Sequence, residues 1–221
     1  TAGAGTCTFD TNNQSISGNA ATTFGGDVAI SGAITLQNSN TDTVTITGDL
    51  TGTEAGSTYQ NNANATTNFK GAVLSTGTLT ATANPNDIYY TGGSAQTVKA
   101  TTYHNLYVQP SANSVTSLIG SGTLTVNNNL TIGNGTNTGV VIESTTNDPN
   151  ISVTGDLSVS ANTTFTNSDN TSATLNIDGN LTNSGTLTAP SGSNNDSFTL
   201  AGNFTNNGTF NHNGGQLTLD T

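Results

Sequence analysis

Apolar and polar residues alternate with a period of two along most of the chain. Stretches such as Val44-Thr45-Ile46 and Leu175-Asn176-Ile177 place every second side chain on one face and put Thr, Ser or Asn on the other. This period is that of a β-strand, and a helical repeat of 3.6 residues is nowhere visible. The pattern therefore predicts an all-β protein built from many short strands.

A repeated frame organises these strands. It reads apolar-x-apolar-x-Gly-Asp/Asn-apolar-Thr/Ser, and its four clearest copies begin at Val44, Ile151, Leu175 and Phe198. With weaker copies, the anchor positions are 26, 48, 71, 104, 128, 155, 179 and 202. Units of about 23 residues with two or three short strands are typical of a parallel β-helix, whose turns stack at about 4.8 Å. The sequence predicts a single-stranded parallel β-helix, or β-solenoid, of about eight or nine turns.

The expected organisation is a short N-terminal segment, 1–13, followed by a solenoid over 14–221. The anchors lie 33 residues apart between Gly71 and His104, so an insertion is expected at about 82–102. Extra residues in a solenoid turn leave as a loop, and such a loop often carries function. A partly degenerate extra coil explains the same spacing equally simply.

Composition excludes two classes of partner. The chain has two Lys, no Arg and a formal net charge of -11, so it cannot hold a phosphate backbone and no nucleic-acid binding is expected. No run approaches the roughly 18 apolar residues of a membrane-spanning helix, so no membrane insertion is expected. Thr, Asn, Gly and Ser supply 126 of 221 residues, yet the regular apolar spacing argues against disorder.

Candidate catalytic and metal-binding residues are few. The motifs GxSxG, GxxxxGK, CxxC and HExxH are missing, and His104 and His212 have no neighbouring ligand and are expected at the surface or at corners. Asp27 and Asp49 are the carboxylates that stacking would bring together, which suits either a calcium ion or two solvated corner residues. We expect no enzyme activity, cofactor or metal; acidic polysaccharide hydrolysis is a third and less favoured function.

Four of the five Tyr lie in a stretch of nineteen residues, 89–107, that overlaps the expected insertion: Tyr89, Tyr90, Tyr103 and Tyr107. Such a group predicts a patch that stacks on a glycan or docks a partner, because aromatic rings provide a large and rigid contact area. Packing of the same rings against the rod is the competing interpretation. The single Cys7 is two residues before Phe9, on the same strand face, and is expected to be a small buried residue.

Two segments carry a family resemblance. Residues 179–188 (GNLTNSGTLT) and 202–211 (GNFTNNGTFN) resemble the repeats of large bacterial surface β-solenoids, of which filamentous haemagglutinin-like and autotransporter passenger proteins are examples. The segment 101–108 resembles one that recurs in repetitive secreted bacterial proteins. The resemblance implies an extracellular or cell-surface location and an adhesive or structural role, with no catalytic residues.

The two ends of the expected solenoid suggest its function. Neither shows a capping helix or an atypical polar repeat, so open strand edges are expected near Thr8, Phe9, Leu217 and Leu219. Stacking of identical copies would pair both edges, and the segment 1–13 could add a strand to a neighbour. The sequence thus predicts the structural subunit of a secreted extracellular filament that polymerises head to tail. The alternative is an adhesin fragment that binds glycans or host matrix through the Tyr-rich bulge.

Overall fold

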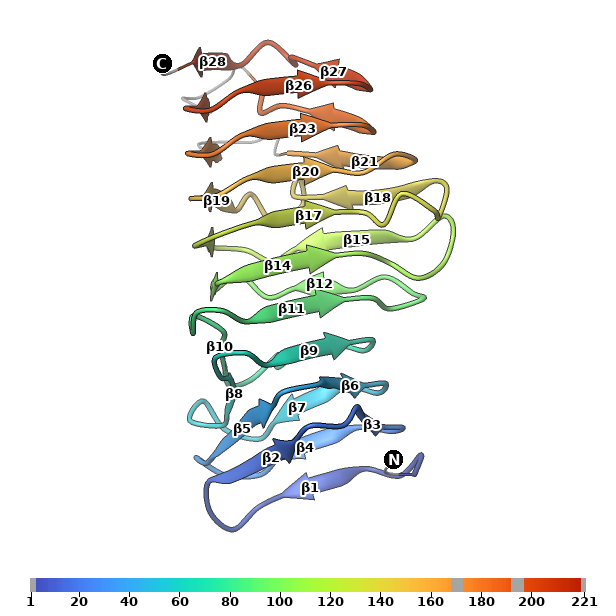
Figure 1. The fold of residues 1–221 in the computed structure, drawn as a ribbon, viewed down its shortest axis with the longest axis vertical. Coiled ribbons are helices and arrows are strands. Elements are labelled where there is room, and N and C mark those ends of the chain that lie inside the picture. Colours follow the sequence, from blue (N-terminus) through green and yellow to red (C-terminus); the bar gives the residue numbers. More distant parts are fainter. Residues whose placement is uncertain (1–2, 168–172, 192–196, 220–221) are drawn as a thin grey trace.

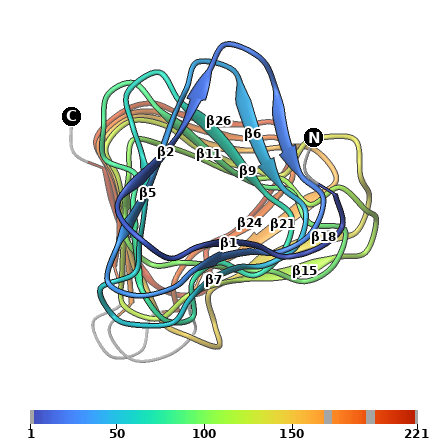
Figure 2. The same cartoon turned by 90° about the horizontal axis from the view of Figure 1, so that it is seen from below.

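The computed structural model describes residues 3–167, 173–191 and 197–219. In these residues every regular element is a β-strand, and every pair of strands in the five sheets is parallel. The strands lie across a long axis and stack into a rod (Figure 1), which is roughly triangular when seen along that axis (Figure 2). The prediction of an all-β parallel solenoid is confirmed, with nine coils counted on its longest sheet.

The triangle has three sides, and the chain visits them in the fixed order side 1, side 2, side 3. Side 1 is a continuous nine-stranded sheet. Its members are β3 (Thr22–Phe24), β6 (Thr43–Ile46), β9 (Thr66–Phe69), β11 (Asp87–Tyr90), β14 (Asn105–Val108), β17 (Leu130–Ile132), β20 (Leu157–Val159), β23 (Leu181–Asn183) and β26 (Phe204–Asn206).

Side 2 consists of two sheets in succession, and both lie along the same side of the triangle (Figure 2). The first contains β1 (Cys7–Phe9), β4 (Val28–Ile30) and β7 (Leu50–Gly52). The second contains β12 (Thr97–Val98), β15 (Thr116–Ile119), β18 (Val140–Glu143), β21 (Thr163–Thr166), β24 (Thr186–Thr188) and β27 (Thr209–Asn211).

Side 3 also has two sheets, joined by a parallel bridge between Ala81 and Tyr103. The first contains β2 (Gln14–Gly18), β5 (Thr35–Asn40), β8 (Thr58–Asn61) and β10 (Thr78–Thr80). The second contains β13 (Thr102–Tyr103), β16 (Thr123–Val126), β19 (Asn150–Val153), β22 (Thr174–Ile177), β25 (Ser197–Leu200) and β28 (Gln216–Leu219).

Alternation along each strand builds the core. In β20, Leu157 and Val159 are buried in the rod while Ser158 between them is half-exposed, and the strands of side 1 between the end strands β3 and β26 alternate in the same way. Each inward side chain lies on its counterpart one coil below, as Leu157 does on Leu130. Full burial of one such residue stabilises the fold by about 1.5–3 kcal/mol, and a single coil could not provide it. Stacking is therefore what forms the core.

The segment expected as an insertion, 82–102, does not leave the rod as a loop. It contains β11, which pairs with β9 and β14 on side 1, and β12, which pairs with β15 on side 2. The coil that begins at Asp87 is short, because the equivalent Asn105 follows 18 residues later. The alternative of a degenerate extra coil describes this segment better than an insertion does.

The wide anchor spacing has a geometric cause. In the first coils the Gly-Asp corner lies between sides 1 and 2, as Gly48-Asp49 does between β6 and β7. In the later coils it lies between sides 3 and 1, as Gly179-Asn180 does between β22 and β23. The interval from Gly71 to His104 therefore holds the rest of one coil and a further short coil. The repeated frame moves from one corner to another here, so the anchors do not form one column.

The N-terminal segment belongs to the solenoid. Its strand β1 pairs with β4 of the same chain through Cys7 with Val28 and Phe9 with Ile30. This strand thus forms the first position of side 2 within its own chain, and its opposite edge faces away from the rod.

Glycine at the Gly-Asx corners is required by close backbone approach. A Cβ placed on Gly179 would overlap the backbone carbonyl of Gly155, and one on Gly202 would overlap that of Gly179. These contacts are with backbone, which cannot move without separating two coils.

Gly179→Ala is expected to lower the free energy of unfolding by about 1–3 kcal/mol, the usual cost of forcing extra atoms into a packed site. Gly93→Ala is the matched control, because its Cβ would meet Ser111 and Ala112 at ordinary distances of 3.6 and 3.9 Å. Urea unfolding followed by circular dichroism measures both. Equal stability of the two variants would contradict the stated role of the corner glycines.

Candidate functional site

Asparagine and aspartate side chains connect the corners of neighbouring coils. Along one corner, the Oδ1 atoms of Asn105, Asn129, Asp156 and Asn180 each accept the backbone N–H of the equivalent residue one coil later, at 3.1, 2.9, 2.7 and 3.0 Å. The last N–H in this ladder is that of Asn203. Each accepting oxygen serves the coil on its C-terminal side, so the ladder has a direction along the rod.

A second, shorter ladder lies on the other corner. Asp27 Oδ1 accepts the N–H of Asp49 at 2.9 Å, and Asp49 Oδ1 accepts that of Ala72 at 2.7 Å. These two carboxylates, weighed as calcium ligands from the sequence, thus serve as corner acceptors. In the described residues no group of three or more His, Cys, Asp or Glu side chains could hold a metal ion.

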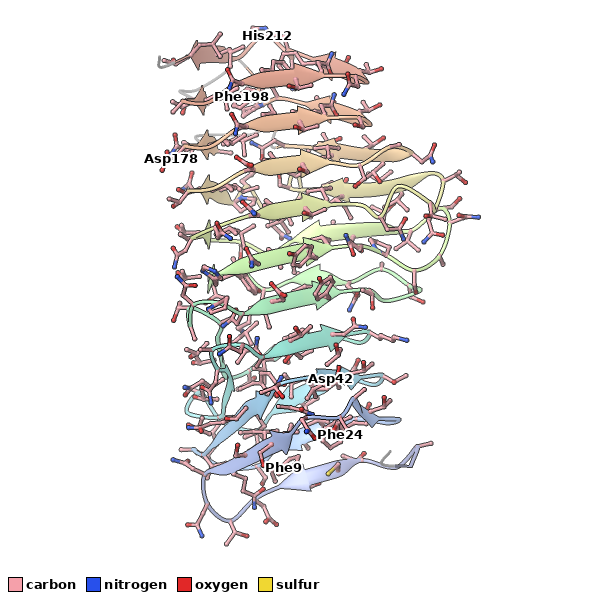
Figure 3. All side chains as sticks on the ribbon, viewed as in Figure 1. Phe9, Phe24, Asp42, Asp178, Phe198 and His212 are labelled. Carbon is pink, nitrogen blue, oxygen red and sulfur yellow. The ribbon has the colours of Figure 1, made fainter. Side chains whose placement is uncertain are left out.

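The two end coils form the candidate self-association surface. At the N-terminal end, Phe9 lies in the lowest coil, and at the other end His212 lies in the uppermost coil (Figure 3). The end strands are β1, β2 and β3 at one end and β26, β27 and β28 at the other, and each has a pairing partner on one side only in the described part of the chain.

Inward-facing residues in the end coils are partly uncovered. At the N-terminal end they are Cys7, Phe9 and Ile16, which pack on the core but remain half-buried. At the C-terminal end Leu219 is 58% exposed, although Leu200 directly beneath it is 1% exposed. The other C-terminal members of this set are half-buried, namely Phe204, Phe210 and Leu217. Each end therefore presents apolar surface that one more coil would cover.

The residues predicted at the ends divide by orientation. Phe9 and Leu217 pack on the core, and Leu219 is the exposed large apolar residue in the part of the chain that the structure describes. Thr8 is exposed and points outward, so its backbone rather than its side chain is available at the edge. Cys7 is half-buried and packs on the core, beside the open edge.

The four predicted tyrosines do not form one patch. Strand alternation in β11 puts Tyr89 on the outer face and Tyr90 in the core, where Tyr90 is 1% exposed. Tyr103 is fully buried, and its hydroxyl lies 3.0 Å from that of Tyr90 and donates to the Lys99 carbonyl at 2.7 Å. Tyr90 and Tyr103 are therefore core residues, and no ligand can stack on them.

Tyr89 and Tyr107 form an outer pair. Their rings are stacked face to face with centroids 4.2 Å apart and planes 5° apart, because β11 and β14 align them in register. Each ring thus covers one face of the other. A glycan that stacks on an aromatic ring needs an open face, and the register neighbours Asn68 and Thr131 follow directly below and above the pair. This geometry leaves the pair less open ring surface for stacking on a sugar than the sequence suggested.

Burial raises the pKa of Tyr89 to about 12, and the ionised forms of Tyr107 and Asp87 act in the same direction. Burial also raises the pKa of Tyr107, again with help from Asp87. Within the core, burial raises the pKa of Tyr90 to about 12 and raises the pKa values of Tyr59 and Tyr103 well above their ordinary value. All five tyrosines are thus held neutral above their ordinary pKa of 10.0.

A groove that the sequence did not predict lies on side 2, where the first sheet ends and the second begins. It has a volume of about 650 Å³ and is lined by Val73, Leu74, Gln96, Lys99 and Leu118 among others. The Lys99 ammonium reaches across and donates to the Leu74 carbonyl at 2.6 Å, and burial lowers its pKa. Long polar side chains thus replace strand pairing at this break.

Buried amides are a second feature that the sequence did not reveal. Asn38 and Asn61 are fully buried, and Asn38 Nδ2 donates to Asn61 Oδ1 at 3.0 Å. Thr67 Oγ1 donates to the same Asn61 oxygen at 2.8 Å and also contacts the Tyr59 hydroxyl at 2.9 Å. Alternation marked these positions as inward, but nothing in it distinguishes a buried amide from an apolar residue. Their role is structural, since Asn38 Nδ2 and Asn61 Nδ2 also donate to the backbone carbonyls of Thr66 and Ala65 at the corner where β9 begins.

The histidines lie at corners, as the sequence suggested. His104 connects β13 and β14 and is largely buried, while His212 follows β27 and is exposed. Among the described residues no helix is long and apolar enough to span a membrane.

Comparison of the chain with protein-family models, with curated proteins and with solved structures gives no match. The geometry of this chain, and chiefly that of its two ends, is therefore what bears on its function.

Asp156→Ala is expected to destabilise the fold by about 1 kcal/mol, because it removes the oxygen that accepts the Asn180 N–H. Asp156→Asn keeps that oxygen, and its free energy of unfolding is expected to lie within about 0.5 kcal/mol of the wild-type value. Urea unfolding compares the two variants. A loss of stability in Asp156→Asn equal to that in Asp156→Ala would show that charge, not the accepted hydrogen bond, is what matters.

The raised pKa values predict instability in alkali. Between pH 10 and pH 12 the unfolded chain releases phenolic protons that the folded chain retains, so stability falls as the pH rises through this window. Asp87→Asn is expected to move the first tyrosinate step, followed at 295 nm, toward pH 10, because a negative charge is removed beside Tyr89 and Tyr107. Asp156→Asn is the control. An unchanged first step in Asp87→Asn would contradict this account.

Proposed function

We propose that this chain is a structural subunit that polymerises head to tail into a filament through its two open end coils. The observation that carries the proposal is the combination, at both ends, of unpaired strand edges with partly uncovered core residues. A second copy is the occupant that fits, because its coil has the same triangular outline and the same alternation. The polymer would continue the stacking of parallel strands from one copy to the next.

Backbone pairing supports this partner. On side 2, the N–H of Thr209 and the C=O of Asn211 are bonded to β24, so those of Phe210 point to the open side of β27. In β1 the N–H of Cys7 and the C=O of Phe9 are bonded toward β4, which leaves those of Thr8 on the open side. A parallel strand is what each edge lacks.

Apolar contact supports it as well. Covering Leu219 and the half-buried residues of both ends would remove apolar surface from water at about 25 cal/mol per Å². Every coil in the interior of the rod obtains its stability in this way. The formal net charge of -11 per copy opposes association, and salt screens such repulsion over about 8 Å at 0.15 M.

The proposed setting is the cell exterior, and the proposed role is non-enzymatic. The outer faces of the strands carry Thr, Ser and Asn, which suit a long solvated filament. The glycan-binding alternative has less support, because two of its four tyrosines are buried and the other two cover each other.

Negative-stain microscopy and sedimentation velocity of the purified chain test the proposal. We expect unbranched filaments whose mean length increases from low salt to 0.15 M salt, because screening weakens the repulsion between copies. Monodisperse short rods at every salt and protein concentration would refute the proposal.

Leu219→Lys is expected to shorten the filaments at least tenfold, because it places a charge in the contact between copies. Since Leu219 is 58% exposed, a single copy of the variant should have the same free energy of unfolding as the wild type. The control is Thr136→Lys, which adds the same charge at an exposed position on the flank of the rod and should leave filament length unchanged. Equal filament lengths in both variants would contradict the placement of Leu219 in the contact.

A further inference from the structure

Three features of the rod could bear a further site: the groove at Lys99, the stacked pair of Tyr89 and Tyr107, and the end coils. In the groove the Lys99 ammonium already donates to the Leu74 carbonyl, and in the pair each tyrosine ring covers one face of the other. The end coils carry more information, because the columns of the solenoid fix how one copy can lie on another.

We propose that successive copies stack without rotation about the rod axis, so that β1 of one copy pairs with β27 of the preceding copy and β2 pairs with β28. This inference rests on the proposed function. It adds the register on two sides: Cys7 lies on Phe210, and Ile16 lies on Leu219. On side 1 this register leaves one strand position between β26 of the preceding copy and β3, because β1 and β2 come before β3 in the chain.

The first support is a column on side 3. Leu219 lies on Leu200, and the register partners in β22, β19 and β16 continue this column down to Tyr103. The bridge from Tyr103 to Ala81 continues it into the first sheet, where it ends at Ile16 beneath Asn38. Ile16 and Leu219 are thus the two ends of one inward-facing column. A copy added without rotation places one directly on the other.

The second support is spacing. Ile16 is nine positions after Cys7 in the sequence, and Leu219 is nine positions after Phe210. The strands β1 and β27 have three residues each, and the connections to β2 and β28 have four residues each, 10–13 and 212–215. Sides 2 and 3 can therefore be in register at the same time.

A competing register rotates the added copy by one side and places Cys7 on Phe204. The next inward residue of the preceding copy, Phe210, then follows after six residues instead of nine. The connections also differ, because β26 and β27 are separated by residues 207–208 and β1 and β2 by residues 10–13. The corners of the two copies would not coincide, which favours the unrotated register.

The third support is Gly5. The segment Gly5-Thr6-Cys7 has the same frame as Gly208-Thr209-Phe210. At that corner a Cβ on Gly208 would overlap the backbone carbonyl of Gly185 in the coil below, so the position of Gly208 has no room for a side chain. A Cβ on Gly5 meets nothing within 4 Å in the single chain. Its contact in the proposed register is Gly208 of the preceding copy, where a side chain would be excluded.

Hydrogen-bonding geometry agrees with this register. With Cys7 on Phe210, the open-side N–H of Thr8 faces the open-side C=O of Phe210, as required in a parallel pair. A shift of one residue along the strand would pair the inward residues of one copy with the outward residues of the other.

Cysteine cross-linking tests the register with the native Cys7 as one partner. Phe210→Cys and Phe204→Cys are each polymerised under reducing conditions, checked by microscopy, and then oxidised. In the proposed register Phe210→Cys gives a ladder of covalent multimers on a non-reducing gel, with at least tenfold more than Phe204→Cys. The double variant Cys7→Ser, Phe210→Cys is the control and should give none.

The reverse result, multimers from Phe204→Cys and none from Phe210→Cys, would overturn the register while leaving head-to-tail assembly intact. Absence of filaments in the wild type would instead refute the proposed function. The two failures are therefore distinguishable.

Gly5→Val supplies a second measurement that needs no cross-link. It is expected to fold and unfold as the wild type does, yet to shorten filaments at least tenfold, because its side chain meets the Gly208 corner of the next copy. Gly93→Ala, a substitution on the flank, is the control and should polymerise normally. Filaments of normal length from Gly5→Val would contradict the contact between Gly5 and Gly208.

Discussion

Every coil of this protein depends on the coil beside it. A strand of three or four residues can neither satisfy its backbone groups nor bury its apolar side chains alone, and both needs are met by an identical strand stacked in parallel register. The inward columns, such as the one that contains Leu130, Leu157 and Leu181, are the direct result. Each coil is therefore stabilised by its contacts with the coils on either side, and a coil at the end of the rod lacks one of these two contacts.

The corners are subject to the same constraint. Because coils stack so closely, the chain can turn only where backbone passes over backbone, which is why glycine occupies positions such as Gly155 and Gly179. The residue that follows supplies a side-chain oxygen for the next coil's N–H, as Asp156 does for Asn180. Glycine permits the approach and Asp or Asn bonds the coils, so the Gly-Asx pair is a physical unit that recurs with the coil.

Strand alternation and the corner frame were sufficient to predict the fold. The strands around Leu157 and Leu175 lie where the pattern placed them, because both period and burial are properties of the local sequence. The corner that the frame occupies was not predictable, since Gly48-Asp49 and Gly179-Asn180 have the same frame at different corners. The tyrosine cluster was misread for a related reason: proximity along the chain joined Tyr89 to Tyr90, but a strand sends neighbours to opposite faces. The buried Asn61 and the groove at Lys99 depend on contacts between coils, which no single segment shows.

The central claim is that the open ends are joined as the coils are, with strands perpendicular to the filament and stacked along it. X-ray fibre diffraction from aligned filaments tests it most directly. The account predicts a sharp reflection at about 4.8 Å on the meridian, parallel to the filament axis, because the strand spacing would continue across every junction on sides 2 and 3. A 4.8 Å reflection on the equator would contradict it, because the long axes of the rods would then lie perpendicular to the filament axis.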